Sequence, residues 1–212
     1  MTNADQVAGD AADPSGNPAS TPTAERLADA AISLIARNGF DSLSVRRVAT
    51  EASVTGGTVQ HHFPSKVELT VAALDRTVQR QTDRVRALPS THTSLVDRFV
   101  GGLCAILPAD EASTEEAVVW VAMSAAVPAH PFIAERQRLA TATTRRWIEA
   151  TVRRAQDEGE IGSDVDAVEV TPLVEAALEG MMQRVIADDE LRGDTGCRQL
   201  RAMVHRLLGL DD

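Results

Sequence analysis

Apolar residues recur at helical spacing along most of this chain, and no stretch alternates apolar and polar residues as a strand does. The first clear segment spans residues 22–38 and has a one-sided apolar stripe. Pro22 suits the first position of a helix, and Thr21 suits the capping position before it. Gly39 can adopt the left-handed conformation that ends a helix, so the pattern predicts a helix from Pro22 to Asn38.

Two short apolar segments follow, at 44–52 and 55–63. Ser44 and Thr55 are suitable N-caps for them, and Pro64 cannot continue the second. Two short helices joined by a tight turn have the proportions of a helix-turn-helix unit. The sequence therefore predicts this motif over residues 44–63.

A longer helix is expected after Pro64, because Ser65 and Glu68 have the spacing of a capping box. Its expected inward residues are Val67, Val71, Leu74, Val78 and Val85. Residues 87–93 contain a proline and are predicted to form a linker.

The remaining sequence is also helical in pattern. Capping boxes are expected at Ser113 with Glu116 and at Asp166 with Glu169. Pro172 predicts a kink, or a later helix start at Thr171. Further helices are predicted over 95–107, 113–127, 131–158, 166–188 and 197–208. We expect an all-α fold of about nine helices, with a disordered tail at 1–21, a domain at 22–82 that contains the helix-turn-helix, and a larger domain at 83–212.

The composition of the 212 residues is that of a soluble globular protein, with 43% apolar and 25% charged residues. The sequence contains no apolar run long enough to cross a membrane, and its first twenty residues do not resemble a secretory signal. Cys104 and Cys197 lie far apart and lack the spacing of a zinc module. We therefore expect a cytoplasmic protein without a disulfide scaffold, a metal site or a cofactor.

The net charge of −10 argues against binding to nucleic acid, but the charge is unevenly distributed. Residues 22–86 carry nine Lys or Arg and seven Asp or Glu, whereas 87–212 carry twelve and twenty-one. A weakly basic segment thus contains the predicted helix-turn-helix.

The second short helix has an outward face that suits the major groove of DNA. Its polar candidates are Thr55, Thr58, Gln60, His61 and His62; Gln can bond adenine through two hydrogen bonds. Gly56 and Gly57 leave room for the backbone to approach a phosphate closely.

Three basic residues near this helix are further candidates for contact with phosphate. Lys66 begins the following helix, where the helix dipole also favours an anion. Arg46 and Arg47 lie on the first short helix and are either DNA contacts or part of a solvated helix face. His61 and His62 point in different directions, so a metal site there is disfavoured.

Residues 24–74 carry a run of short motifs without a gap: Asn38-Gly39-Phe40, Ser44-Val45-Arg46, Val48-Ala49, Val54-Thr55, Gly57-Thr58-Val59, His62-Phe63 and Lys66. Together they resemble the N-terminal domain of TetR-family transcriptional regulators. The resemblance implies a dimer that binds a palindromic operator, with Thr58, His61, His62 and Lys66 at positions that touch DNA. Gln60 stands where the family usually has Tyr, and Gly56 where it often has a basic residue, which affects the operator that is read.

The larger domain offers apolar residues for a pocket that binds a small effector. The candidates are Phe99, Leu103, Cys104, Trp120, Met123, Val127, Phe132, Trp147 and Met181, with His130, Gln137, Thr143 and Thr144 as polar partners. Taken singly, such an apolar residue is more often core, and such a polar residue more often surface or helix cap, than a ligand contact. The segment 177–182 resembles the C-terminal domain of the choline-responsive regulators of this family.

The helix expected at 167–187 is apolar on nearly all sides and must be covered twice. A partner subunit would cover the second side, so we expect a homodimer through the last two helices. A buried central helix in a monomer is the alternative.

The sequence shows no nucleophile elbow, phosphate-binding loop or paired metal ligands, which argues against an enzyme. We therefore predict a ligand-responsive, DNA-binding repressor that a small apolar or amphipathic molecule releases from a palindromic operator. The alternative is a helical dimeric protein that binds a small molecule and has weak or no affinity for DNA.

Overall fold

The computed structural model describes residues 22–89 and 94–210, which form nine α-helices and three short 3₁₀ turns, with no strand among them. This confirms the predicted all-α fold. The elements are α1 (Pro22–Asn38), η2 (Phe40–Ser42), α2 (Val45–Glu51), α3 (Gly56–His62), α4 (Lys66–Arg86), α5 (Leu95–Cys104), α6 (Glu111–Ala126), η3 (Val127–Ala129), α7 (Pro131–Asp157), α8 (Ala167–Ala187), η4 (Asp189–Leu191) and α9 (Asp194–Leu207). The predicted tail at 1–21, the Thr21 cap and residues 90–93 of the linker lie outside the described residues.

Local capping signals locate most helix starts correctly. The hydroxyl oxygen of Ser44 accepts a hydrogen bond from Arg47 N at 3.3 Å, and that of Ser65 accepts one from Glu68 N at 3.1 Å. Asp166 caps α8 as expected, and α8 then continues through Pro172 from its start at Ala167. The alternative start at Thr171 is therefore wrong.

The predicted capping box of Ser113 with Glu116 is also wrong. Asp110 caps α6, because its carboxylate accepts from Ser113 N at 2.7 Å while the Ser113 hydroxyl accepts from Asp110 N at 2.9 Å. Glu116 is instead buried and forms ion pairs with Arg84 and Arg80 of α4. The spacing was right for a box, but an acid one turn earlier provides the cap.

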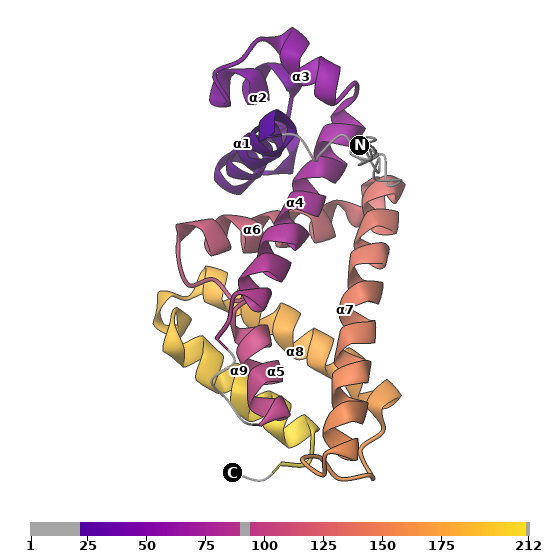
Figure 1. The fold of residues 1–212 in the computed structure, drawn as a ribbon. Coiled ribbons are helices and arrows are strands. Elements are labelled where there is room, and N and C mark those ends of the chain that lie inside the picture. The colour runs from indigo at the N-terminus through magenta and orange to yellow at the C-terminus, as the bar shows by residue number, and fades with distance from the viewer. Residues whose placement is uncertain (1–21, 90–93, 211–212) are drawn as a thin grey trace, which may run out of the picture.

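The helices form two packed units joined by α4, α6 and α7 (Figure 1). Helices α1 to α3 lie at one end, α4 runs from them into the other unit, and α6 crosses between the two. The first core consists of residues from α1 to α4 together with Val119 and Met123 of α6 and Ile133 of α7. The second core consists mainly of residues from α5, α7, α8 and α9.

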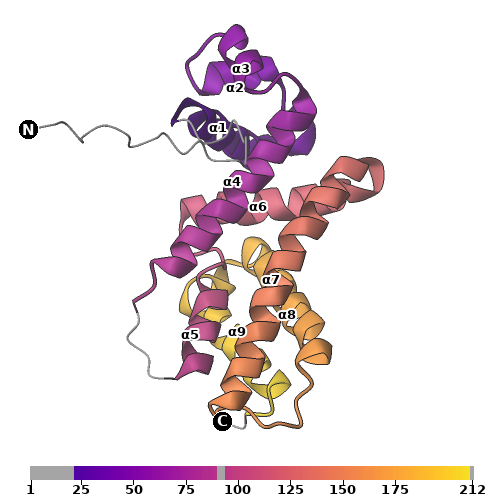
Figure 2. The ribbon, with the colours of Figure 1, turned by 45° about the vertical axis from the view of Figure 1, so that its right-hand side comes forward.

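The buried face of α4 differs from the expected one. Leu74 is buried as predicted, but Val67 is 44% exposed, and Leu69, Ala72 and Ala73 are buried in its place. Val71, Val78 and Val85 are half-buried, and α4 packs first against α1 and only then against the larger unit (Figure 2). A boundary at residue 82 falls inside this continuous helix.

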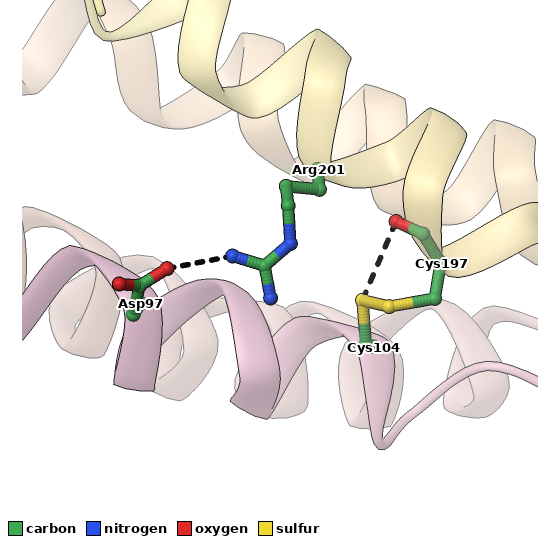
Figure 3. The surroundings of a disulfide bond; sticks show 4 residues. All are labelled: Asp97, Cys104, Cys197 and Arg201. Atoms are coloured by element: carbon green, nitrogen blue, oxygen red, sulfur yellow. Dashed lines mark hydrogen bonds and ion pairs between the residues drawn. A yellow bond between two sulfur atoms is a disulfide. The ribbon is translucent and has the colours of Figure 1, made fainter. Parts of the chain in front are cut away.

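Cys104 and Cys197 form a disulfide bond, contrary to the expectation from their spacing (Figure 3). The two residues are 93 positions apart in sequence, but their Cα atoms are 5.2 Å apart because α5 packs against α9. An ion pair at 2.7 Å between Arg201 and Asp97 joins the same two helices. Spacing along the chain could not show this pairing, since it arises only from tertiary packing.

Candidate DNA interface and effector cavity

The helix-turn-helix unit rests on a small apolar core. Val48 and Val59 are fully buried, and Phe63 is 2% exposed. Ser53 lies in the turn between α2 and α3 with φ of 55°, a left-handed conformation that is unfavourable for a residue with a side chain. Core contacts and this turn together fix the angle between the two helices.

Two contacts attach α2 and its turn to α1. Arg37 of α1 forms an ion pair with Glu51 at the end of α2. The Arg26 guanidinium donates to the carbonyl oxygen of Ala52 at 3.5 Å. The orientation of α3 therefore depends on α1, and α1 in turn packs on α4 and α6.

The start of α3 presents an open backbone to solvent. Thr55 caps it by accepting from Thr58 N at 3.1 Å, and the two hydroxyls are 3.0 Å apart. A Cβ atom at Gly56 would meet no atom within 4 Å, so packing does not require glycine there. The missing side chain leaves the helix start accessible to a phosphate group.

Most of the predicted DNA contacts belong to α2 and α3, and these two helices lie together at one end of the molecule (Figure 1). Gln60 and His61 of α3 are exposed, and Thr58 and His62 are half-buried. The rings of His61 and His62 are 5.3 Å apart and inclined at 74°. Among the described residues no three His, Cys, Asp or Glu side chains are grouped as for a metal ion.

The basic side chains of this surface are available to an anion. Arg46 and Arg47 of α2 are exposed and form no ion pair within the described part of the chain. Lys66 is the first residue of α4, and its ammonium group lies 5.5 Å from the centre of the Phe40 ring. These three charges and the polar face of α3 form one surface, which we call the α3 surface.

A cavity of about 60 Å³ lies between α4, α6, α7 and α8 of the larger unit. Its lining combines apolar and polar side chains: Val78, Gln81, Ile106, Trp120, Ala140, Thr141, Thr144, Glu175, Leu178, Glu179 and Met182. Known ligand pockets usually measure about 300–1,000 Å³, so the cavity suits a small ligand or a partly closed site.

Two buried polar atoms of the lining have no hydrogen-bond partner, Gln81 Nε2 and Glu175 Oε1. The other oxygen of Glu175 accepts from Arg145 at 2.8 Å. Glu179 lies one turn further along α8 and is solvent-exposed as a residue. Burial of its carboxyl group and repulsion by Glu175 raise its pKa, against a hydrogen bond from Trp120 that lowers it.

Trp120 connects this cavity to both units. It lines the cavity and packs against both the first and the second core. Its carbonyl oxygen accepts from Gln137 Nε2 at 3.4 Å, and the same nitrogen donates to Ser124 at 2.9 Å. A ligand in the cavity would therefore contact a residue that also borders the core of the helix-turn-helix unit.

Comparison with known proteins identifies both halves of the chain. Residues 27–73 match the family of bacterial regulatory proteins called tetR, and residues 96–209 match the C-terminal domain of BetI-type transcriptional repressors. The second match alone covers more than half of the chain. The chain belongs to the TetR family of transcriptional regulators.

Several relatives resemble this TetR-family regulator over nearly their whole length. The HTH-type transcriptional regulator UidR of Escherichia coli K12 is 28% identical over 187 residues, which cover 88% of this chain and 93% of UidR. A transcriptional regulator from Rhodococcus sp. Rha1 has a TM-score of 0.77 at 27% identity, over 89% of this chain and 97% of its own. A regulator from Saccharomonospora viridis, in complex with choline, has a TM-score of 0.71 at 26% identity, over 87% and 94%. The family and these relatives are regulators rather than enzymes.

Of the nine apolar residues predicted for the effector pocket of this regulator, only Trp120 lines the cavity. Phe99, Leu103, Cys104 and Met181 belong to or pack against the second core, and Met123, Val127 and Phe132 belong to or pack against the first. Trp147 packs on Phe99, with ring centres 5.2 Å apart. The predicted pocket residues are therefore spread over two cores, because a one-sided apolar pattern is typical of core faces as well as of pocket walls.

The predicted polar partners are also dispersed. Thr144 lines the cavity, whereas Thr143 is exposed. His130 lies between the rings of Phe40 and Phe132, at 5.2 and 5.7 Å. Sequence reasoning missed Gln81, Glu175 and Glu179. Two acids one turn apart on an apolar helix were the available signal for the last two.

One face of α8 in this regulator remains uncovered. Val168 is 57% exposed and Leu173 is 53% exposed, and Ala176 and Gly180 continue the exposed face. A Cβ atom at Gly180 would meet nothing within 4 Å. No helix of the described residues is long and apolar enough to span a membrane.

Proposed function

We propose that this chain is a dimeric repressor that binds a palindromic operator and releases it when a small molecule enters the cavity between α4, α6, α7 and α8. The single observation that carries the DNA-binding part is the α3 surface. Its arginines are exposed without ion pairs, and the open start of α3 is not explained by packing. We expect the protein to act in the cytoplasm, where operator DNA is located.

Specificity would come from α3 and affinity from the basic residues around it. Gln60 is exposed at the position where a long polar side chain can reach a base edge in the major groove. Arg46, Arg47 and Lys66 would contact phosphates, which supply affinity without sequence information.

The dimer would form through α8 and α9. The exposed apolar face of α8 needs a cover, and α9 packs beside it. Two such helices from each subunit make a four-helix interface with twofold symmetry, which matches the symmetry of a palindrome.

The same helices that line the cavity support coupling to DNA. Arg80 of α4 pairs with Asp29 of α1 at 2.9 Å and also with Glu116 of α6. Ser33 of α1 donates to Glu115 of α6 at 2.9 Å. A ligand that binds more tightly to one arrangement of α4 and α6 would therefore shift the equilibrium toward the matching positions of α1 and α3. The size of this shift, as a free energy, equals the difference in the ligand's binding free energy between the two arrangements.

The test is selection of DNA from fragmented genomic DNA of the source organism by the purified protein at moderate salt. We expect a few fragments to be enriched by the wild type, and Gln60→Ala to change the preference among variants of the enriched site. Equal weakening on every sequence would show that Gln60 does not read bases. Absence of any enrichment would instead favour a helical ligand-binding protein without DNA activity.

A further inference from the structure

The cavity contains an unused hydrogen-bond acceptor and an unused donor. Glu175 is only 9% exposed, and its Oε1 atom has no partner. Gln81 Nε2 is buried in the same lining, also without a partner. Buried polar atoms are nearly always paired, because an unpaired one loses its hydration without compensation. Both atoms therefore indicate a polar ligand.

The charge of the lining indicates that this ligand is a cation. Glu175 and Glu179 both line the cavity, and no Lys or Arg does. Arg145 pairs with Glu175 from outside the lining and compensates one of the two carboxylates. A second positive charge would compensate Glu179, which lines the same cavity one turn along α8 from Glu175.

The vacant acceptor also restricts the kind of cation. For the cationic centre itself to pair with Glu175 Oε1, it must donate a hydrogen bond, which the N–H groups of a protonated primary or secondary amine do and a quaternary nitrogen cannot. The volume of about 60 Å³ sets the size, because one water needs about 10–15 Å³ measured in the same way. This leaves room for roughly four to six water-sized groups.

We propose that the cavity binds a small protonated amine that carries a neighbouring oxygen, such as a short amino alcohol. Its ammonium group donates to Glu175 Oε1 and to the Glu179 carboxylate, and its oxygen accepts from Gln81 Nε2. This inference rests on the proposed function in one respect, that this cavity is the effector site. Beyond that function, it specifies the chemical class of the effector: a protonated amine with N–H donors, bound in preference to a quaternary ammonium.

The test measures binding directly by isothermal titration calorimetry with three small probes and no DNA. Ethanolamine carries both the ammonium and the oxygen, n-propylamine replaces the hydroxyl by a methyl group, and choline lacks the N–H donors. We expect ethanolamine to bind at least tenfold more tightly than choline, and several-fold more tightly than n-propylamine.

Variants at the edge of the cavity assign the contacts. Glu179→Gln should weaken ethanolamine by about tenfold or more, because a charged hydrogen bond is replaced by a neutral one. Gln81→Met should remove the preference for ethanolamine over n-propylamine. Glu169→Gln is the matched control, since it removes an exposed acid of the same helix outside the lining. Thermal unfolding of each variant checks that it is folded.

The outcomes separate this inference from the proposed function. Choline binding as tightly as ethanolamine would overturn the inference, as would no effect of Glu179→Gln on ethanolamine binding. Release of DNA by a neutral apolar molecule, without measurable amine binding, would also overturn it and leave the repressor intact. Amine binding with the expected ranking, but without effect on DNA, would support the ligand class and refute the effector role of the cavity.

Discussion

The bond between Cys104 and Cys197 gives the sharpest prediction about stability. It ties α5 to α9 across 93 positions of sequence. Reduction with dithiothreitol, or the variant Cys197→Ser, opens this loop and changes little else in the folded protein. The ion pair of Arg201 with Asp97 and the apolar packing between the two helices remain.

The size of the effect follows from loop entropy. Closing a loop of about this length restricts the unfolded chain by about 4.7 kcal/mol at 25 °C. Measured effects of natural disulfides are usually about 2–5 kcal/mol, so we expect a loss in that range. A change of 1 kcal/mol in stability corresponds to roughly 2–4 °C for a chain of this size, which gives a decrease in Tm of roughly 4–20 °C.

The assay is thermal unfolding followed by circular dichroism, with and without reductant, at one fixed protein concentration because the unfolding of the proposed dimer would depend on dilution. Cys197→Ser is the matched control and should unfold alike in both conditions. If the wild type yields two free thiols after reduction but keeps its unfolding midpoint, the loop-entropy argument is refuted.

Three further predictions concern single side chains. Lys66→Ala should weaken binding to all DNA sequences alike and reduce the slope of log affinity against log salt by about one; an unchanged slope would exclude a phosphate contact. Leu173→Arg places a charge on the exposed face of α8 and should yield monomers in sedimentation, and a persisting dimer would exclude this interface. Hydrogen bonds from Leu95 N and Val96 N lower the pKa of Glu160, so its stabilisation is present above the unfolded value near 4.3 and lost as pH falls through the lower folded value. Glu160→Gln should lower the free energy of unfolding by about 1 kcal/mol at pH 7. Between those two pKa values, the stability of the variant should fall less steeply with decreasing pH than that of the wild type. The same pH dependence in both proteins would refute this assignment.

The helix-turn-helix unit could be predicted in detail because its signals are local. Ser44, Thr55 and Ser65 each cap the helix that begins beside them, and the cap needs only the next three residues. Val48 and Val59 are buried as their spacing indicates. Such capping and spacing signals depend on neighbouring residues only, so they predict local structure independently of how the rest of the chain packs.

The larger unit could be predicted only as a set of helices. Glu116 has the spacing of a capping residue, yet it is buried because Arg84 and Arg80 approach it from α4. Cys104 and Cys197 meet only because α5 and α9 pack together. The cavity depends on how α4, α6, α7 and α8 meet, and spacing within one helix contains no information about that.

The central claim is that two copies of this chain place their α3 helices in successive major grooves of one operator. Footprinting of a selected genomic fragment tests it most directly, with the wild type and Leu173→Arg side by side. The account predicts two protected, symmetry-related half-sites with centres about 34–36 Å apart for the wild type, and loss of both for the variant at the same concentration. A single unsymmetrical protected patch, or equal protection by the monomeric variant, would contradict it.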